Sequence, residues 1–95
     1  MAAVIPVSQF LPDALAAVLR KAPLTPEKVA FAWRTAVGPA MDRVTSIELK
    51  GAVLHVTAKD AAWQREVERS AALIHTRLDS LLGTAIVRGL DVTVR

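Results

Sequence analysis

Residues 61–83 form the stretch that most constrains how this chain can fold. Its bulky apolar residues recur at steps of three and four, and about 3.6 residues per turn brings such positions onto one face of a helix. Asp60 stands where an N-cap acceptor belongs, and Gly83 stands where a helix most easily ends. We therefore predict one long amphipathic helix, with a buried stripe of Trp63, Val67, Ser70 or Ala71, Ile74, Leu78, and Leu81 or Leu82.

A stripe of this kind must cover a flat apolar surface, which the rest of the sequence offers only as a small sheet. Residues 45–50 and 52–58 alternate between apolar and polar side chains around Lys50-Gly51, a pattern typical of a β-hairpin. Residues 86–95 form a third strand, with alternation in its second half. Because the long helix is long enough to return the chain, we expect the third strand to lie parallel to the second.

Two further helices are expected before the hairpin. Ser8 is the candidate cap of the first helix, which runs to about Lys21. The second helix follows the start signal at residues 25–27 and ends before Gly38-Pro39, after which residues 40–43 add a short helical turn. The expected buried stripe of the first helix is Leu11, Leu15, Val18 and Leu19.

The element order is therefore α-α-β-β-α-β, and the fold class is α+β, with a three-stranded sheet covered on one face by the long helix. At 95 residues, we expect a single domain comprising residues 1–95.

No window approaches the roughly 20 apolar residues that span a bilayer, and residues 1–10 do not have the pattern of a signal peptide. Because the sequence also contains no cysteine, we expect a cytoplasmic protein.

Catalysis is not expected from the residues present. His55 and His75 have no ligand or general-base partner at a motif spacing, so each is expected to be solvated or bonded locally. Glu66 and Glu68 point in different directions on their helix and do not form a carboxylate pair. The sequence lacks a P-loop, a dinucleotide-binding glycine motif and a nucleophile elbow. We therefore predict no catalytic residue, no metal site and no cofactor.

A moderate positive charge makes nucleic-acid binding a candidate function. The formal net charge is +3 and the pI is about 10, with no run of basic residues. The alternative is that the arginines of the long helix pair with Glu66, Glu68 or water. Aromatic residues make up 4% of the sequence, so sequence-specific base reading is not expected. The candidate phosphate contacts are Arg43, Lys50, Lys59, Arg65 and Arg69.

Phe31 is the candidate partner-binding residue. On the second helix Val29, Trp33 and Ala36 share one face, and Phe31 points roughly opposite to it. Two interpretations follow, since Phe31 is either sandwiched between the first helix and the main core or exposed as an anchor for a partner.

From residue 32 to residue 94 an ordered set of short motifs resembles the DciA family of bacterial proteins. The set begins with Trp33 and Val37-Gly38, and continues with Thr45 and with Gly51-x-x-Leu54-x-Val56 in the hairpin. It ends with Trp63-x-x-Glu66-Val67 at the start of the long helix and with Leu78, Leu81 and Gly83 at its end. The order of the motifs, rather than any one of them, carries the resemblance.

The resemblance implies a KH-like arrangement of helices and sheet and an accessory role in DNA replication. Members bind the hexameric replicative helicase and single-stranded or tailed DNA, and help the helicase onto its template without being ATPases. The sequence has no GxxG loop of the kind with which KH domains hold a nucleic-acid backbone, and it ends at Arg95, directly after the last strand. DNA contact is therefore expected to be weak and electrostatic, and helicase contact to be the main interaction.

The motif residues themselves are expected to be architectural. Trp33 and Trp63 are predicted in the core, and Gly51 is predicted to serve the turn. Glu66 is expected to bond a helix-end donor or to pair with Arg77.

Two alternative functions follow from the same sequence. One is a general KH-like module that binds RNA or single strands. The other is a homo-oligomeric interaction scaffold built on exposed apolar surface, such as Phe31 or a strand edge.

Overall fold

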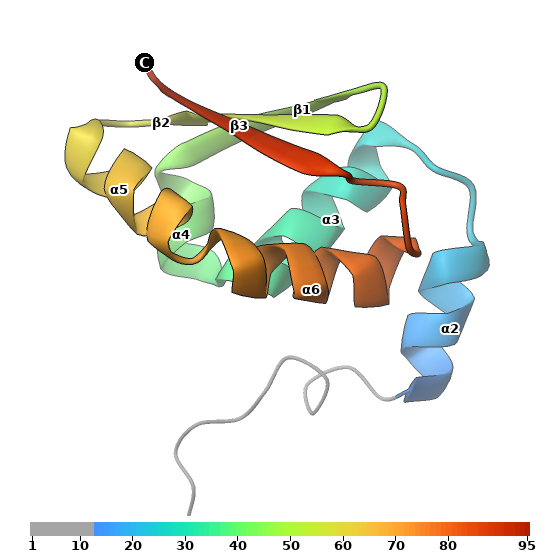
Figure 1. Ribbon diagram of the computed structural model, residues 1–95. Coiled ribbons are helices and arrows are strands. Elements are labelled where there is room, and N and C mark those ends of the chain that lie inside the picture. Colours follow the sequence, from blue (N-terminus) through green and yellow to red (C-terminus); the bar gives the residue numbers. More distant parts are fainter. Residues whose placement is uncertain (1–12) are drawn as a thin grey trace, which may run out of the picture.

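The computed structural model describes residues 13–95, and within them the predicted α+β class and the order of the strands are confirmed. Three helices precede a hairpin, and two helices then lead to the last strand (Figure 1). The predicted start of the first helix at Ser8 lies outside the described residues. The elements are α2 (Asp13–Lys21), α3 (Pro26–Val37), α4 (Pro39–Arg43), β1 (Thr45–Lys50), β2 (Val53–Ala58), α5 (Ala61–Arg69), α6 (Ala71–Leu82) and β3 (Gly89–Val94).

The strands form one sheet in the order β1-β2-β3. β1 runs antiparallel to β2, with Lys50 opposite Val53 at the turn, and β2 runs parallel to β3. Gly51 has φ +61° and occupies the first position of the two-residue turn, where a type II′ hairpin turn takes glycine. The predicted hairpin and the predicted parallel return of the third strand are both confirmed.

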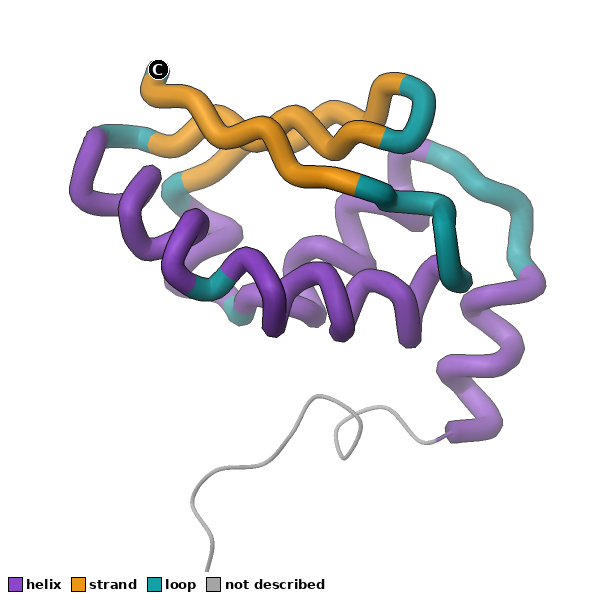
Figure 2. Tube along the Cα trace, viewed as in Figure 1, coloured by secondary structure: helices purple, strands orange, loops and turns teal. Residues whose placement is uncertain are grey.

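The helices lie on one side of the sheet, and no helix of residues 13–95 covers the opposite face (Figures 1 and 2). Along β2, Leu54, Val56 and Ala58 are buried toward the helices, while His55 and Thr57 alternate with them on the open face. The core between the two layers consists of Val29, Ala32, Trp33, Ala36, Leu54, Val56, Val67, Ile74, Leu78, Leu81, Leu82 and Val87.

Trp33 joins the helical layer to the sheet, as the sequence predicts. Its side chain is 1% exposed, and its indole N–H donates to the Thr45 hydroxyl over 3.0 Å. Thr45 in turn donates to the Met41 carbonyl over 2.8 Å. The indole therefore has both a buried ring and a satisfied polar group, which is what a buried tryptophan requires.

The predicted single helix over residues 61–83 is wrong in one respect, because it divides at Ser70. The N–H of Ser70 bonds to the carbonyls of both Glu66 and Val67, and α6 begins at the next residue. α5 packs against β3 and β2, whereas α6 packs against α3 and α2. Because of the division, α5 and α6 each pack against a different set of elements. The predicted caps are confirmed, since Asp60 accepts from the Trp63 N–H and Gly83 ends α6 at φ +107°.

Trp63 is only half-buried, so its predicted place in the core is wrong. It lies in the first turn of α5, at the end of the sheet, where the layers no longer enclose a side chain on every side. Of the rest of the predicted stripe, Val67, Ile74, Leu78, Leu81 and Leu82 are buried, whereas Ser70 and Ala71 are only half-buried.

The docking of α2 also differs from the prediction. Val18 is 65% exposed and Leu19 is half-buried, while Leu11 and Leu15 lie outside the residues whose side chains are described. A buried ammonium binds the end of this helix as well, because Nζ of Lys28 donates to the carbonyls of Arg20 and Ala22 over 3.2 and 2.7 Å, while Leu19 packs against the core. These carbonyls stand at the C-terminus of α2, where helix carbonyls lack partners and a cation is favourable.

The third strand begins at Gly89, three residues later than the predicted Ile86. The intervening residues turn the chain back onto the sheet, with Ala85 at φ +73° and Val87 buried in the core. Pairing starts where the Arg88 N–H reaches the Ala52 carbonyl over 2.7 Å.

Candidate nucleic-acid interface

Three basic residues from distant parts of the chain gather at the end of the sheet opposite the hairpin, and we call this set the basic end: Arg43, Lys59 and Arg95. The backbone brings them together, because the Lys59 N–H donates to the Val44 carbonyl and the Arg95 N–H donates to the Ala58 carbonyl, both over 2.9 Å. In Figure 1 this is the end at which the C-terminus and the start of α5 meet.

The charges of the basic end are open to a ligand. Arg43, Lys59 and Arg95 are all exposed, and none forms an ion pair with a carboxylate among residues 13–95. Two acids adjoin the basic end along the chain: Asp60 has its carboxylate engaged in capping α5, and Asp42, next to Arg43, forms no ion pair among the described residues. Three exposed cations without acidic partners form a surface that attracts an anion, and salt screens that attraction.

The two arginines of α5 differ in their surroundings. Arg69 pairs with Glu66 over 2.9 Å, so for Arg69 the predicted alternative of an internal pair is confirmed. Arg65 is exposed and has no such partner among the described residues. Arg65 lies on α5, six residues beyond Lys59 along the chain.

Glu66 does not pair with Arg77, which corrects that expectation. The guanidinium of Arg77 instead donates to the Ala36 carbonyl at the end of α3, over 2.8 Å. The two residues are eleven positions apart, which at about 1.5 Å per residue is about 16 Å along a helix, too far for their side chains to pair.

Lys50 stands apart from the other predicted phosphate contacts. The hairpin register places Thr45 opposite Ala58 and Lys50 opposite Val53, so Lys50 lies at the far end of β1, about 16 Å away at ~3.3 Å per residue. Its ammonium is 3.8 Å from the Glu48 carboxylate. The structure therefore brings together Arg43 and Lys59 and leaves Lys50 outside the group.

Arg95 was not among the predicted contacts, although the sequence contains the signal for it. A third strand parallel to the second must end beside the end of the second, so Arg95 must lie near Lys59. Nη2 of Arg95 donates to the Ser46 hydroxyl over 3.4 Å, reaching across the end of the sheet from β3 to β1.

Phe31 is 48% exposed on α3, on the side opposite the buried Ala32, Trp33 and Ala36. Of the two interpretations of this residue, the exposed anchor agrees with the described residues and the sandwiched one does not. Leu73 on α6 is a second large apolar side chain on the surface, at 52% exposure.

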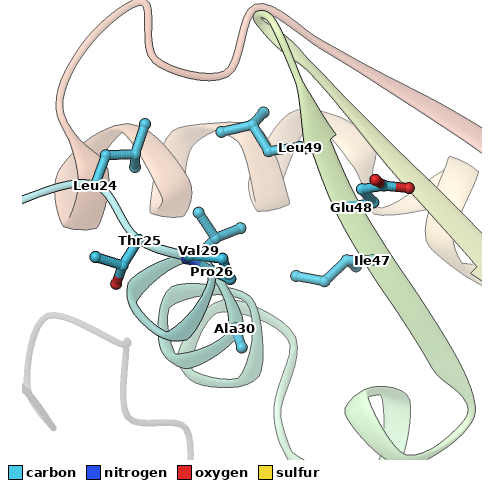
Figure 3. A pocket seen from close by; sticks show the side chains of 8 residues that line it. All are labelled: Leu24, Thr25, Pro26, Val29, Ala30, Ile47, Glu48 and Leu49. Carbon is cyan, nitrogen blue, oxygen red and sulfur yellow. The ribbon is translucent and has the colours of Figure 1, made fainter.

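A groove of about 440 Å³ lies between the start of α3 and β1 (Figure 3). Ile47 and Leu49 point into it from β1, toward α3. Among the described residues nothing pairs with the outer edge of β1, whereas α5 covers the edge of β3 and the Gln64 side chain donates to the Val92 carbonyl over 3.1 Å. The lining residues are Leu24, Thr25, Pro26, Val29, Ala30, Ile47, Glu48 and Leu49.

Both histidines are bonded locally, as predicted. Nδ1 of His55 is 3.1 Å from the Asp91 carboxylate across the sheet, and Nε2 of His75 is 2.7 Å from the Val87 carbonyl.

In the described part of the chain no group of three or more His, Cys, Asp or Glu side chains is placed to hold a metal ion. None of the helices from Asp13 onward has the length and apolar character needed to cross a membrane.

These features describe a small α+β protein with a helix-backed sheet and an exposed cationic surface at one end of that sheet. The sequence matches the family described as Dna[CI] antecedent, DciA, over residues 6–92, and the chain belongs to this family. Membership points to a role in helicase loading during DNA replication, and the family is one of accessory proteins rather than of catalytic enzymes. No curated protein matches the chain.

Proposed function

We propose that this chain is a non-enzymatic, cytoplasmic accessory protein of DNA replication that binds the replicative helicase and, more weakly, single-stranded or tailed DNA. The observation that carries the proposal is the family match over residues 6–92. The basic end supports the DNA contact, because exposed arginine and lysine side chains contact phosphates without reading sequence.

The exposed face of α3 is the surface that we assign to the helicase. Aromatic side chains are enriched at protein interfaces, and a few such residues usually dominate the binding free energy. Phe31 is the one large aromatic residue with nearly half of its surface exposed in the described part of the chain. Its position leaves the basic end, formed by other elements, free to meet DNA at the same time.

Capture of the purified cognate helicase by the immobilised protein, at low salt and in both nucleotide states, tests the proposal. We expect binding by the wild type and about ten-fold or greater loss of affinity for Phe31→Ala. Leu73→Ala is the matched control, because it truncates another exposed apolar side chain on a different helix. No capture in either nucleotide state contradicts helicase binding, and equal losses for the two variants contradict the assignment to Phe31.

A homo-oligomeric scaffold is the second candidate, and the unpaired outer edge of β1 beside the apolar groove favours it. Sedimentation of the protein alone over a range of concentrations separates the two. A sedimentation coefficient that rises with concentration, together with no helicase capture, supports the scaffold instead.

A further inference from the structure

The open face of the sheet carries a row of hydroxyl groups that crosses all three strands. The register places Ser46 opposite Thr57 and Thr57 opposite Thr93. Ser46 and Thr93 are exposed and Thr57 is half-buried. With strands about 4.8 Å apart, the row spans about 10 Å perpendicular to the strands.

Two cations of the basic end stand beside this hydroxyl row on the same face. Lys59 follows Thr57 by two residues and Arg95 follows Thr93 by two residues, and the strand pairing continues through both. Because side chains alternate between faces, these two point to the same side as the hydroxyls. Arg95 already donates to Ser46 over 3.4 Å.

The acids of the open face lie one row further from the basic end and are engaged there. Asp91 is 3.1 Å from His55, and Glu48 is 3.8 Å from Lys50. The sheet face is therefore polarised, with cations and hydroxyl donors at one end and partnered carboxylates beyond them. A phosphodiester backbone complements the first of these regions in charge and in hydrogen bonding.

No Phe, Trp or Tyr of the described residues stands on this face to stack a base, and the imidazole of His55 is engaged with the Asp91 carboxylate at 3.1 Å. The Phe and Trp residues of the described chain, Phe31, Trp33 and Trp63, all lie on helices. Recognition on the sheet is thus limited to the backbone of the strand, in contrast to sheet surfaces that stack bases on aromatic side chains.

We propose that the phosphate backbone of a single nucleic-acid strand crosses the open sheet face along Ser46, Thr57 and Thr93, with Lys59 and Arg95 binding its phosphates. This assignment rests on the proposed DNA contact and adds to it the path of the strand. It places the strand on the sheet rather than along α5, where Arg69 is already paired with Glu66.

Thr57→Glu tests the path, with Val53→Glu as its matched control. Both substitutions put one carboxylate on the open face of β2, but Val53 lies four residues away, about 13 Å from Thr57 and beyond the screening length of about 10 Å at 0.1 M salt. In fluorescence anisotropy with a labelled oligo-dT at low salt, we expect Thr57→Glu to weaken binding about five-fold or more. Val53→Glu should change the affinity less than about two-fold.

Thr57→Val provides a second variant in case the glutamate disturbs the strand. It keeps the shape of the side chain and removes the hydroxyl, and we expect a loss of about two- to three-fold, with circular dichroism confirming the fold. Equal effects of Thr57→Glu and Val53→Glu overturn the path, as does a loss produced only by Arg65→Glu/Arg69→Glu; in both cases DNA binding by the protein stands. Absence of binding by the wild type instead removes the DNA contact on which the path rests.

Discussion

At the scale of single residues, the two tryptophans of this chain make unequal contributions to stability, although they occupy similar positions in the apolar pattern. Trp33 is 1% exposed and bonded to Thr45, whereas Trp63 is half-buried at the end of the sheet. Trp33→Ala should lower the free energy of unfolding by about 3–5 kcal/mol. Trp63→Ala should cost about 1–2 kcal/mol, because less apolar surface is removed from the interior.

Urea unfolding followed by circular dichroism measures both variants. If Trp33→Ala does not fold, Trp33→Phe keeps most of the ring and removes only the indole N–H and some volume. Equal losses for Trp33→Ala and Trp63→Ala would mean that Trp63 contributes as a core residue after all.

The two tryptophans show how far the burial of a single residue could be predicted from the sequence. Spacing of three and four along a helix shows that a residue is on the apolar side, and it placed Trp33 on that side and Phe31 opposite to it, while leaving open whether Phe31 is covered or exposed. It does not show where the covering layer ends. Trp63 stands at that limit, so only the packing of α5 against the sheet decides its exposure.

At the scale of elements, one buried charge binds the C-terminal end of α2. Lys28→Met should therefore keep the apolar stem of this side chain while releasing the C-terminal end of α2. We expect a loss of about 1–3 kcal/mol in unfolding free energy and faster hydrogen exchange at the backbone amides of α2. Lys21→Met is the control, because Lys21 is exposed on α2 itself. Unchanged exchange in α2 for Lys28→Met would show that the ammonium does not hold the helix.

The elements that the sequence misplaced all depend on distant neighbours. The division at Ser70 leaves the apolar spacing from Val67 to Ile74 and Leu78 unbroken, so periodicity gives no sign of it. The division follows from the separate packing of α5 on β3 and α6 on α3. In the same way, the late start of β3 depends on where the chain meets Ala52 in the hairpin.

At the scale of the whole molecule, the order of elements and the parallel return of the last strand were predictable from periodicity and from chain connectivity. To predict which basic residues lie close together, the register of the hairpin was needed as well. The turn at Gly51 that brings Thr45 opposite Ala58 also fixes Lys50 opposite Val53. A register that brings Arg43 close to Lys59 therefore places Lys50 at the opposite end of the hairpin. The KH-like classification stays a prediction.

The basic end also predicts how binding of the whole molecule to nucleic acid depends on salt. Three exposed cations on three phosphates release counterions on binding, and about 0.7 per contact for a single strand gives a slope near −2 in a plot of log affinity against log salt. Affinity for oligo-dT should then fall roughly twenty-fold between 50 and 200 mM salt. The same decrease is expected for a mixed-sequence DNA and for an RNA of equal length, because no base is read. An affinity that becomes independent of salt but dependent on sequence at high salt would support the general KH-like module instead, since stacking on bases persists when phosphate contacts are screened.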